Sequence, residues 1–598
     1  MKQEIFSDDE ELLHKLFHKH AVSAALSMMG VQACLMINTI LAGKFFGGEG
    51  LAVMGIVSPI YSIYAAIGAL VGIGGSIITA HALGRDDKES ANETFSCALI
   101  FGILISAIVS IISLAFQKEF LYILGCYDKN FDMAQSYSSI YILGGVFTAL
   151  FYMPYHFLKL TGQLKYLIFL FLGMAALNGA LDYLFCIAFN LNMAGIALGT
   201  VISSLITVLI GLKTLLSSFK FHSESILNSS FLIKELIRFG APSALRQFLL
   251  FARFVLMNNL LVIVAGQTGL VIFSVVKVIE NLSIIILSGI SQATSAFVGV
   301  FFEEKDNTSI RRIEKQAHII SIELILVLIA GVWLFSDEIC LLFGISSNET
   351  SLRLQVIAGV RIFSLSLLPS IFCMILTSYY QSTKFTKLAN LITANSNFIL
   401  LLIPAYFLAP NFGINMIWYS FTIAAVGTLI ILGIILFVNR SENKSSILLL
   451  DLKGEKNGSF LAFIVKTTVE DISDKVKRIG EFCEKNNLNI KEKTLVMLSM
   501  EEMMMSIKDH CFEGEVDEVM DVRIFVDDEI ILRIRNRGKL FNPIDYYESQ
   551  KNEDELDFAM TDALGIEMIS KSAKSVHYKS TFGINNLTVI IDRNGAVA

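Results

Sequence analysis

The stretch FLYILG at residues 120–125 has a counterpart, ICLLFG, at residues 339–344, so that Gly125 corresponds to Gly344. Each stretch precedes a polar loop and then an apolar helix-like segment. The charged turn GRDDK at 84–88 is matched by EEKD at 303–306 at about the same offset. The pattern indicates one helical unit that is present twice in the chain.

The composition indicates that most of this chain lies in a membrane. Hydrophobic residues make up 54% of the 598 residues and charged residues only 17%, and the mean hydropathy is +0.63. Soluble domains carry about 25% charged residues. The net charge of −7 comes mostly from the two polar ends and favours no nucleic-acid partner. Duplicated apolar bundles are typical of transporters, which hold a substrate between the halves.

Twelve apolar stretches reach the length of about 20 residues that a spanning helix needs. We expect an all-α bundle of twelve transmembrane helices in two six-helix lobes, an N-lobe at 21–220 and a C-lobe at 221–440. The expected spans are 21–42, 52–80, 94–116, 137–160, 166–188, 194–217, 241–265, 269–300, 317–336, 355–380, 388–408 and 413–438.

The two ends of the chain are expected in the cytoplasm. Residues 1–20 lack the basic n-region and the cleavage site of a secretory signal. Lys and Arg gather in the loops that join even-numbered spans to odd-numbered ones, and such loops stay inside. We therefore expect a multi-pass protein of a bacterial inner (cytoplasmic) membrane. The eight cysteines show no C-x-x-C spacing and are expected to be reduced and structural, with no metal site.

A soluble domain is expected at 460–598, after a polar linker at 441–459. There the periodicity changes to short alternating strands and amphipathic helices, which predicts an α+β sandwich of one sheet and one helical layer. The expected strands are 460–468, 522–526, 529–535, 576–579 and 587–591, and the expected helices are 469–486, 490–510 and 565–573.

Six segments occur in a specific order along the apolar part: NTILAGKFFG at 38–47, VSPI at 57–60, GRDDKESA at 84–91, NGALDYLF at 178–185, GAPS at 240–243 and YYQS at 379–382. In this order they resemble the MATE multidrug exporters over about residues 21–438. The resemblance implies a transporter and not an enzyme. It also implies export of drugs and other small molecules by alternating access, with Na⁺ or H⁺ as the coupling ion.

The resemblance also implies a cation site in the N-lobe. The family has an Asp on the first helix and an Asn-x-x-x-Asp pair on the fifth, and Asn178 with Asp182 matches that pair. Their i,i+4 spacing places both on one helix face, and a carboxylate in the bilayer is costly enough to imply a function. A purely structural hydrogen-bond role for Asp182 is the alternative. Thr200 on the next helix is a further candidate oxygen.

Asn38 stands where the family has an Asp on the first helix. Its amide offers a carbonyl oxygen, but it neither titrates nor carries charge. A proton relay of two carboxylates is therefore weakened, whereas a Na⁺ site with one carboxylate stays open.

The second half carries unusual charge for a membrane core. Arg246 and Arg253 lie two turns apart on the seventh helix, Lys277 and Glu280 form an i,i+3 pair on the eighth, and Arg361 lies within the tenth. Snorkelling to the interface explains Arg246, which is near a helix end. Because cations facing lipid are costly, we expect the others to line a central cavity. A basic cavity wall favours an anionic or zwitterionic substrate.

The tail resembles the ATP-binding domain of anti-sigma-factor serine kinases, of the GHKL ATPase group with its histidine-kinase-like fold, over about residues 461–592. The segment LSMEEMMMSIKDH at 498–510 holds Glu501 and Glu502 and has Ser506 where the family has the Asn that binds Mg²⁺. The segment IRNRGKLFNP at 534–543 keeps Gly538.

Two changes in this tail predict weak or absent binding of Mg-ATP. Besides Ser506, Asn536 stands where the family has the Asp that accepts a hydrogen bond from adenine. A glycine-rich helix start at Gly565 is the candidate phosphate-binding segment. The tail is thus expected to regulate the bundle, by docking a cytoplasmic partner of the anti-anti-sigma type. Two alternatives stay open for the whole chain: a flippase for lipid-linked anions, and a membrane sensor that signals through the tail.

Overall fold

The structure is a computed structural model that describes residues 7–83, 87–126, 130–161, 163–221, 230–303, 306–345, 349–443, 459–512, 518–527, 529–543, 545–546, 571–581 and 584–593. The chain divides into two compact units, one of Phe17–Leu448 and one of Leu449–Ala598 with Met1–Leu16. The sequence-based boundaries lie a few residues away, at 20 and 440.

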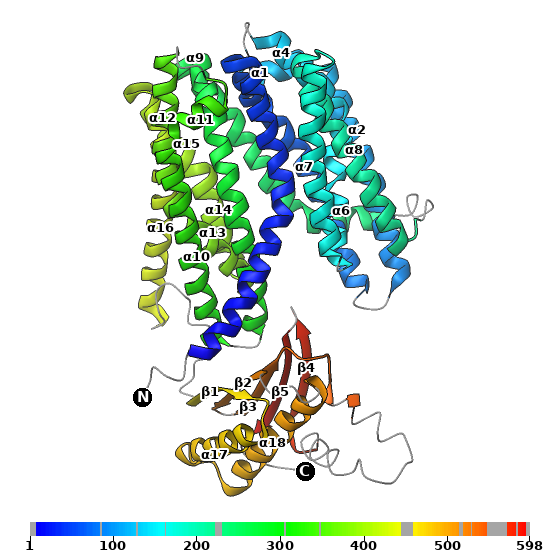
Figure 1. Cartoon of the computed structure of the whole chain (residues 1–598), viewed down its shortest axis with the longest axis vertical. Helices are drawn as coiled ribbons and strands as arrows, with labels where there is room; N and C mark the ends of the chain where they lie inside the picture. Colours follow the sequence, from blue (N-terminus) through cyan, green and yellow to red (C-terminus); the bar gives the residue numbers. More distant parts are fainter. Residues whose placement is uncertain are drawn as a thin grey trace. The chain divides into compact units, whose positions relative to one another are not determined.

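All the regular elements that the structure describes in the larger unit are helices, as Figure 1 shows. Its first half contains α1 (Ser7–Leu83), α2 (Lys88–Ala115), α3 (Gln117–Ile123), α4 (Phe131–Leu143), α5 (Gly145–Leu150), α6 (Tyr152–Leu160), α7 (Leu164–Ile187) and α8 (Asn192–Ser218). Its second half contains α9 (Ser230–Glu303), α10 (Asn307–Leu334), α11 (Ser336–Leu342), α12 (Thr350–Leu365), α13 (Leu367–Ser382), α14 (Thr386–Ala394), the π-helix η3 (Asn395–Ile399), α15 (Leu400–Phe412) and α16 (Asn415–Asn443).

The two halves repeat the same elements at a nearly constant offset. The helices α10, α11 and α12 follow α2, α3 and α4 at the offset that separates Gly125 from Gly344, and α14 and α16 follow α7 and α8 at a slightly longer one. The helix caps repeat as well. The carboxylate of Asp87 accepts from the amide of Ser90 at 3.0 Å, and that of Asp306 accepts from Ser309 at 3.0 Å, as an N-cap does. The predicted internal repeat is therefore confirmed.

Each of the two longest helices, α1 and α9, reverses direction at a glycine. Gly47 and Gly266 have φ of 58° with ψ of −145° and −140°, a region that is open in practice only to glycine. A Cβ on Gly50 would overlap the carbonyl oxygen of Ala42, on the other side of the Gly47 break. In a straight helix these positions would be about 12 Å apart. The two arms of α1 therefore fold back on each other.

Eight described helices are long and apolar enough to cross a membrane, or ten when two bent pairs are each counted as one span. The bends are 55° between α4 and α5–α6 and 41° between α12 and α13. The first bend falls at Gly144 and Gly145, where a Cβ would overlap Val201 and Tyr64 respectively. The second bend falls at Ser366. Hydropathy predicted both stretches as unbroken spans, because a bend at two glycines or at one serine leaves the apolar content almost unchanged.

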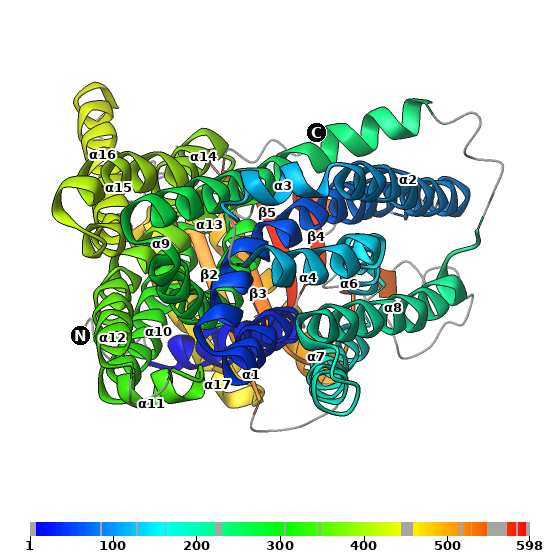
Figure 2. The same cartoon turned by 90° about the horizontal axis from the view of Figure 1, so that it is seen from above.

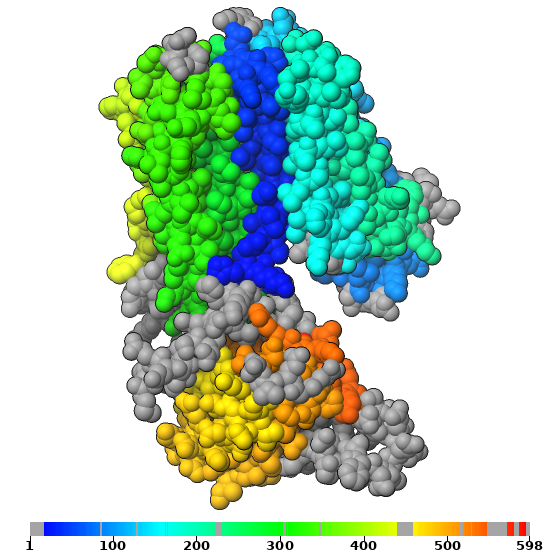
Figure 3. Space-filling model, in the orientation of Figure 1, coloured from blue at the N-terminus to red at the C-terminus, as the bar shows by residue number. Residues whose placement is uncertain are grey.

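The helix α1 lies between the helices of the two halves, as Figures 2 and 3 show. A Cβ on Gly289 of α9 would overlap the α1 backbone at Ala21, and a Cβ on Gly30 of α1 would overlap the α7 backbone at Phe171. Small residues at such crossings allow helix backbones to approach closely in a membrane. The first helix thus packs tightly against both halves.

The smaller unit contains one antiparallel sheet with the strand order β1-β2-β3-β5-β4 and, among its described residues, two helices. The strands are β1 (Ser459–Lys466), β2 (Val519–Val526), β3 (Glu529–Asn536), β4 (Ser575–Thr581) and β5 (Ile584–Asp592), and the helices are α17 (Val469–Lys485) and α18 (Ile490–Cys511). The described elements agree with the predicted α+β layout, and the assignment to the GHKL fold stays a prediction. Most of the helix expected at 565–573 lies outside the described residues.

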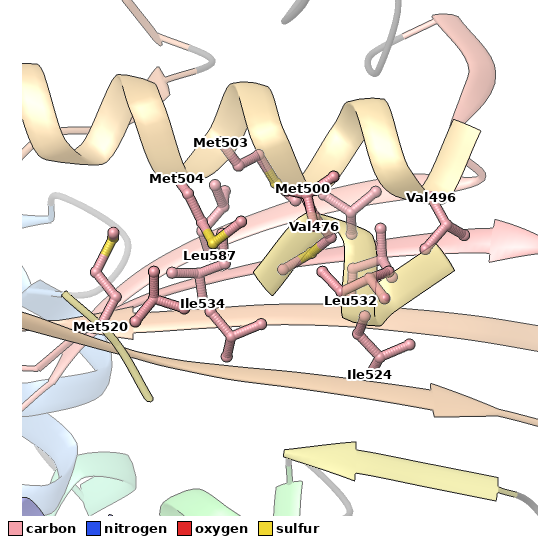
Figure 4. Close-up of a cluster of buried hydrophobic side chains, with 14 of the residues drawn as sticks. Val476, Val496, Met500, Met503, Met504, Met520, Ile524, Leu532, Ile534 and Leu587 are labelled. Atoms are coloured by element: carbon pink, nitrogen blue, oxygen red, sulfur yellow. The ribbon is translucent and has the colours of Figure 1, made fainter. Parts of the chain in front are cut away.

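The core of this unit lies between one face of the sheet and the two helices (Figure 4). Alternate residues of β2 such as Met520 and Ile524 face α18, from which Met500, Met503 and Met504 enter the same cluster. This period of two is what a sheet with one covered face requires. The methionine run of α18 is therefore core packing, as expected of flexible apolar side chains.

The reversal glycines give a direct test of this architecture. Gly266→Ala should lower the free energy of unfolding by about 1–3 kcal/mol, because an alanine is strained at φ of 58°. Gly173→Ala is the matched control, since no heavy atom lies within 4 Å of the added Cβ. It should leave stability unchanged or raise it slightly. Thermal unfolding in detergent measures both, and equal effects would contradict the assigned reversal.

Candidate functional site

The four polar residues predicted for the N-lobe meet in one buried cluster, named here the N-lobe cluster. Asn38 comes from α1, Asn178 and Asp182 from α7, and Thr200 from α8. Asn178 and Asp182 are fully buried, Asn38 is 1% exposed and Thr200 is 7% exposed. The i,i+4 spacing on α7 places Asn178 and Asp182 together. The packing of α1 and α8 against α7 brings Asn38 and Thr200 to them.

Hydrogen bonds connect all four side chains. The amide nitrogen of Asn178 donates to both carboxylate oxygens of Asp182 and to the hydroxyl of Thr200, each at 3.2 Å. The side-chain amide of Asn38 has two possible orientations, and one of them pairs every donor with an acceptor. In that orientation its nitrogen donates to Asp182 Oδ2 at 2.8 Å and to Asn178 Oδ1 at 2.9 Å. In that orientation its oxygen accepts from the Thr200 hydroxyl at 2.8 Å. The single carboxylate is thus held by amides and lies among neutral oxygens.

The second half has no such cluster at the matching positions, all of which lie among the described residues. The repeat offsets pair Asn38 with Met257, Asn178 and Asp182 with Leu400 and Pro404, and Thr200 with Ile423. The same helical framework therefore forms with apolar residues at all four places. Because burying polar groups is costly and the framework does not need them, the N-lobe cluster is a candidate for function.

A glycine that sequence reasoning missed completes the N-lobe cluster. Gly199 on α8 lies so close to Asp182 that a Cβ would overlap the carboxylate oxygen Oδ1. The absence of a side chain at residue 199 thus leaves the room that the Asp182 carboxylate occupies. In the sequence, the only indication of this role is that Gly199 directly precedes the candidate residue Thr200.

In the second half, Arg253 forms an ion pair with Glu280. The distance from Arg253 Nη2 to Glu280 Oε1 is 2.8 Å, and the arginine side chain is 5% exposed. The ammonium of Lys277 lies over the ring of Phe254 at 4.0 Å from its centroid and also faces Phe273. The sequence had suggested Lys277 as the partner of Glu280. Packing of the two arms of α9 instead selects Arg253, which is far away in sequence.

The two remaining arginines lie elsewhere. Arg361 donates to the carbonyl of Trp333 at 3.1 Å and to the hydroxyl of Ser336 at 2.6 Å, at the junction of α10 and α11. Arg246 is exposed and interacts electrostatically with Tyr152 and His156 of the first half. The five charged residues therefore do not form one basic wall, because Arg253 is paired and Arg361 and Arg246 are apart.

A buried carboxylate in the second half, Glu314 on α10, escaped sequence reasoning. The predicted span began at residue 317, whereas α10 begins at Asn307. Glu314 is only 5% exposed. The spacing of Glu314, His318 and Ser321, at i, i+4 and i+7 on one helix face, was the signal that would have found it.

In the smaller unit, Asn536 is committed to internal hydrogen bonds. Its side-chain oxygen accepts from the amide of Gly538 at 3.0 Å and from the amide nitrogen of Asn585 at 3.1 Å. A Cβ on Gly538 would meet the carbonyl oxygen of Cys511 at 2.5 Å. These contacts tie the end of β3 to the end of α18. Asn536 therefore already has the two donors that its oxygen takes.

The other residues that the GHKL resemblance singles out are not joined to one another by hydrogen bonds among the described residues. Ser506 lies on α18, where its carbonyl oxygen is 3.0 Å from His510 Nδ1. Glu501 and Glu502 are on the same helix and partly exposed, and Gly565 lies outside the described residues. His510 stacks on Phe541 with ring centroids 4.3 Å apart.

All eight cysteines are free, and seven of them are buried. In the smaller unit burial raises the pKa of the Cys483 and Cys511 thiols to about 11. Both remain protonated thiols at neutral pH and pack as apolar groups. The burial agrees with the prediction of structural cysteines, and their reduced state stays a prediction.

Comparison with known proteins matches this architecture. The MatE family model matches residues 23–184 and 242–407, one block in each half of the repeat. The chain belongs to the MATE family. The matched blocks cover more than half of the chain and end before the smaller unit, which is an addition to the MATE framework in this protein.

The curated relatives of this MATE protein are multidrug exporters. It is 25% identical over 256 residues to "Multidrug export protein MepA" of Staphylococcus aureus strain MSSA476, which covers 40% of this chain and 56% of MepA. The MepA of Staphylococcus saprophyticus is 24% identical over 174 residues, covering 29% and 39%. The chain thus matches between 39% and 56% of the length of these two relatives.

Solved MATE structures show the same fold. The inward-facing conformation of a multidrug resistance MATE transporter of the MOP superfamily superposes with a TM-score of 0.61 at 20% identity, over 69% of this chain and 96% of that one. A MOP superfamily transporter from Pyrococcus furiosus, described by a reversed polarity of its binding pocket, gives 0.58 at 19% identity, over 74% and 99%. At these identities the likeness establishes the fold alone.

The contacts of the N-lobe cluster predict that removal of the Thr200 hydroxyl lowers the stability of the protein. Thr200→Val keeps the side-chain shape but removes a partner of the buried amides of Asn38 and Asn178. It should lower the free energy of unfolding by about 1–3 kcal/mol. Thr207→Val is the control, because the Thr207 hydroxyl bonds the carbonyl of Ser203 on its own helix and should cost about 0.5 kcal/mol or less. Chemical denaturation in detergent decides, and equal losses would contradict the network.

Proposed function

We propose that this MATE protein is a secondary active exporter of drugs or other small compounds. It works by alternating access and uses Na⁺ or H⁺ as its coupling ion. The observation that carries this proposal is the N-lobe cluster: one carboxylate, two amides and a hydroxyl, buried in a framework whose second copy is apolar at the same places. The fold, the family and the relatives named MepA support it.

The proposed transporter crosses the membrane twelve times with both ends in the cytoplasm. The reversals at Gly47 and Gly266 support two crossings in each of α1 and α9, which raises ten candidate spans to twelve. The excess of Lys and Arg in loops that join even to odd spans supports the orientation.

Asp182 is the proposed coupling residue. A carboxylate buried without a basic partner is stable only when a proton or a cation neutralises it. Asn178, Asn38 and Thr200 offer neutral oxygens around it. Binding of one monovalent cation therefore neutralises the cluster, and a conformational change that admits water to it releases that cation on the other side.

Substitution of the carboxylate tests the coupling. Asp182→Asn keeps the size and shape of the side chain and one of its two acceptor oxygens but removes its charge, so gradient-driven flux in proteoliposomes should be lost while the protein stays folded. Asn38→Asp is expected to strengthen the dependence on a pH gradient, because it places a second titratable group 2.8 Å from the first. Imposed Na⁺ and H⁺ gradients distinguish the two ions. Unchanged flux in Asp182→Asn would end the coupling proposal.

Lys277 is the proposed determinant of substrate charge. Arg253 and Glu280 neutralise each other, which leaves Lys277 as the net positive charge of this trio beside the rings of Phe254 and Phe273. An ammonium next to aromatic faces favours a small molecule with an acidic group and an apolar body. We propose zwitterionic or anionic compounds among the substrates.

Competition experiments test this preference. Lys277→Gln should weaken inhibition by anionic competitors about tenfold, the equivalent of one charge-assisted hydrogen bond, and should affect cationic competitors little. Lys118→Gln, an exposed lysine on α3, is the control. If anions compete equally well with both variants, Lys277 does not contact substrate.

The smaller unit is proposed to regulate transport through a cytoplasmic protein partner, with weak or no binding of nucleotide. The internal commitment of Asn536 and the serine at residue 506 support this role.

Isothermal titration of the full chain with Mg-ATP tests whether the smaller unit binds nucleotide. The heat should indicate weak binding or none. Ser506→Asn with Asn536→Asp should strengthen binding by roughly tenfold or more, because it restores a metal ligand and a charged acceptor. Micromolar binding with turnover by the unaltered chain would instead indicate a kinase or ATPase.

A further inference from the structure

Glu314 is buried in the apolar packing face of α10. It lies in the second turn of the helix, about 10 Å from the start at Asn307, and is 5% exposed. The buried face of α10 is formed by Ile310, Ile313, Glu314, Ala317, Ile320, Ser321 and Ile325. The carboxylate is therefore surrounded by aliphatic side chains of its own helix and by the helices α9 and α13, which pack against α10.

No hydrogen-bond donor reaches the inner oxygen of this carboxylate. Among the residues that the structure describes, Glu314 Oε1 is fully buried and has no partner. An ionised carboxylate in this position loses its hydration without replacement, which costs several kcal/mol. The neutral, protonated form avoids most of that cost.

Two titratable side chains lie next to Glu314. His318, one turn further along α10, places Nδ1 at 2.8 Å from the Glu314 carbonyl oxygen. A carbonyl only accepts, so Nδ1 carries the proton and Nε2 of the neutral ring is an acceptor. Tyr380 of α13 is fully buried and interacts electrostatically with Glu314.

Four cations of the neighbouring helices α9 and α12 have other partners. On α9, Arg253 pairs with Glu280, and Lys277 lies over Phe254. On α12, Arg353 pairs with Asp337, and Arg361 binds Trp333 and Ser336. Of these four cations, none neutralises Glu314.

The first half shows that the fold does not require this carboxylate. The repeat offsets pair Glu314 with Phe95, His318 with Leu99, and Tyr380 with Leu158. Phe95 is fully buried and packs against Phe157 with ring centroids 5.4 Å apart. An apolar core thus fills in one half the place that three titratable side chains occupy in the other.

We propose that Glu314, with His318 and Tyr380 beside it, is a second proton-binding site of this transporter, located in the C-lobe. While α10 stays packed against α13, the carboxylate binds one proton and becomes a neutral carboxylic acid. A conformational change that separates α10 from α13 admits water, and the proton leaves to that water. This proposal rests on gradient-driven export and extends it, because it adds a site in the other half from Asp182.

The donor set favours a proton over a metal ion. Hard cations take several oxygen ligands, and Glu314 has one carboxylate with a tyrosine and a histidine. Within the described part of the chain, no group of three or more His, Cys, Asp and Glu side chains is suited to a metal ion.

Infrared difference spectroscopy of the full chain in lipid vesicles tests the site without reference to transport. A step from acidic to alkaline pH should remove a protonated carboxyl C=O band in an Asp182→Asn background, which excludes the contribution of that residue. Glu314→Gln should lack this band. Glu338→Gln, at an exposed carboxylate of α11, should keep it. Spectra that are the same with and without Glu314 would overturn the proposal.

A conservative variant and a flux assay complete the design. Glu314→Asp retains a carboxylic acid and should keep a band at a shifted frequency, which guards against misfolding of the glutamine variant. Proton-driven uptake into vesicles should be largely lost in Glu314→Gln and retained in Glu338→Gln. If the unaltered protein shows no gradient-driven flux, the exporter proposal fails while the infrared result stands by itself. If flux is proton-driven and insensitive to Glu314, the second site fails alone.

Discussion

The cost of a charge inside a membrane protein is the constraint on which this structure depends. A carboxylate that leaves water must find a basic partner, a cation or a proton. Three carboxylates of the larger unit solve this in three ways. Glu280 has an arginine at 2.8 Å, Asp182 has amide donors and a proposed bound cation or proton, and Glu314, whose inner oxygen has no donor among the described residues, has a proposed bound proton.

Comparison of the two halves of the repeat separates residues that the fold requires from residues that it does not. The reversal glycines and the N-caps after them occur in both halves, so they belong to the framework. The polar residues around Asp182 and Glu314 occur in one half each, so the framework does not need them. Since most buried polar groups cost stability, those that the framework can do without are the best candidates for chemistry.

In the smaller unit, a candidate site residue serves to hold the fold together. The sheet, the two described helices and the methionine-rich core of this unit are regular. Asn536 at the end of β3 uses its side-chain oxygen for hydrogen bonds within the domain, to Gly538 and Asn585. An acceptor that is used within the domain is not available to a ligand, which is the physical basis of the regulatory role proposed above.

The sequence by itself determined what depends on local spacing and composition: the apolar helices, the repeat that pairs Gly125 with Gly344, the i,i+4 pair of Asn178 and Asp182, and the alternation of the tail strands. The tertiary structure decided what depends on the approach of distant segments. It brought Asn38 and Thr200 to Asp182, gave Glu280 to Arg253 rather than to Lys277, moved Arg361 to a helix junction, and buried Glu314 against α13. Spacing along one helix fixes only which residues share a face. Which face meets which is settled by helix crossings at small residues and by the reversals at Gly47 and Gly266, and these are properties of the folded chain.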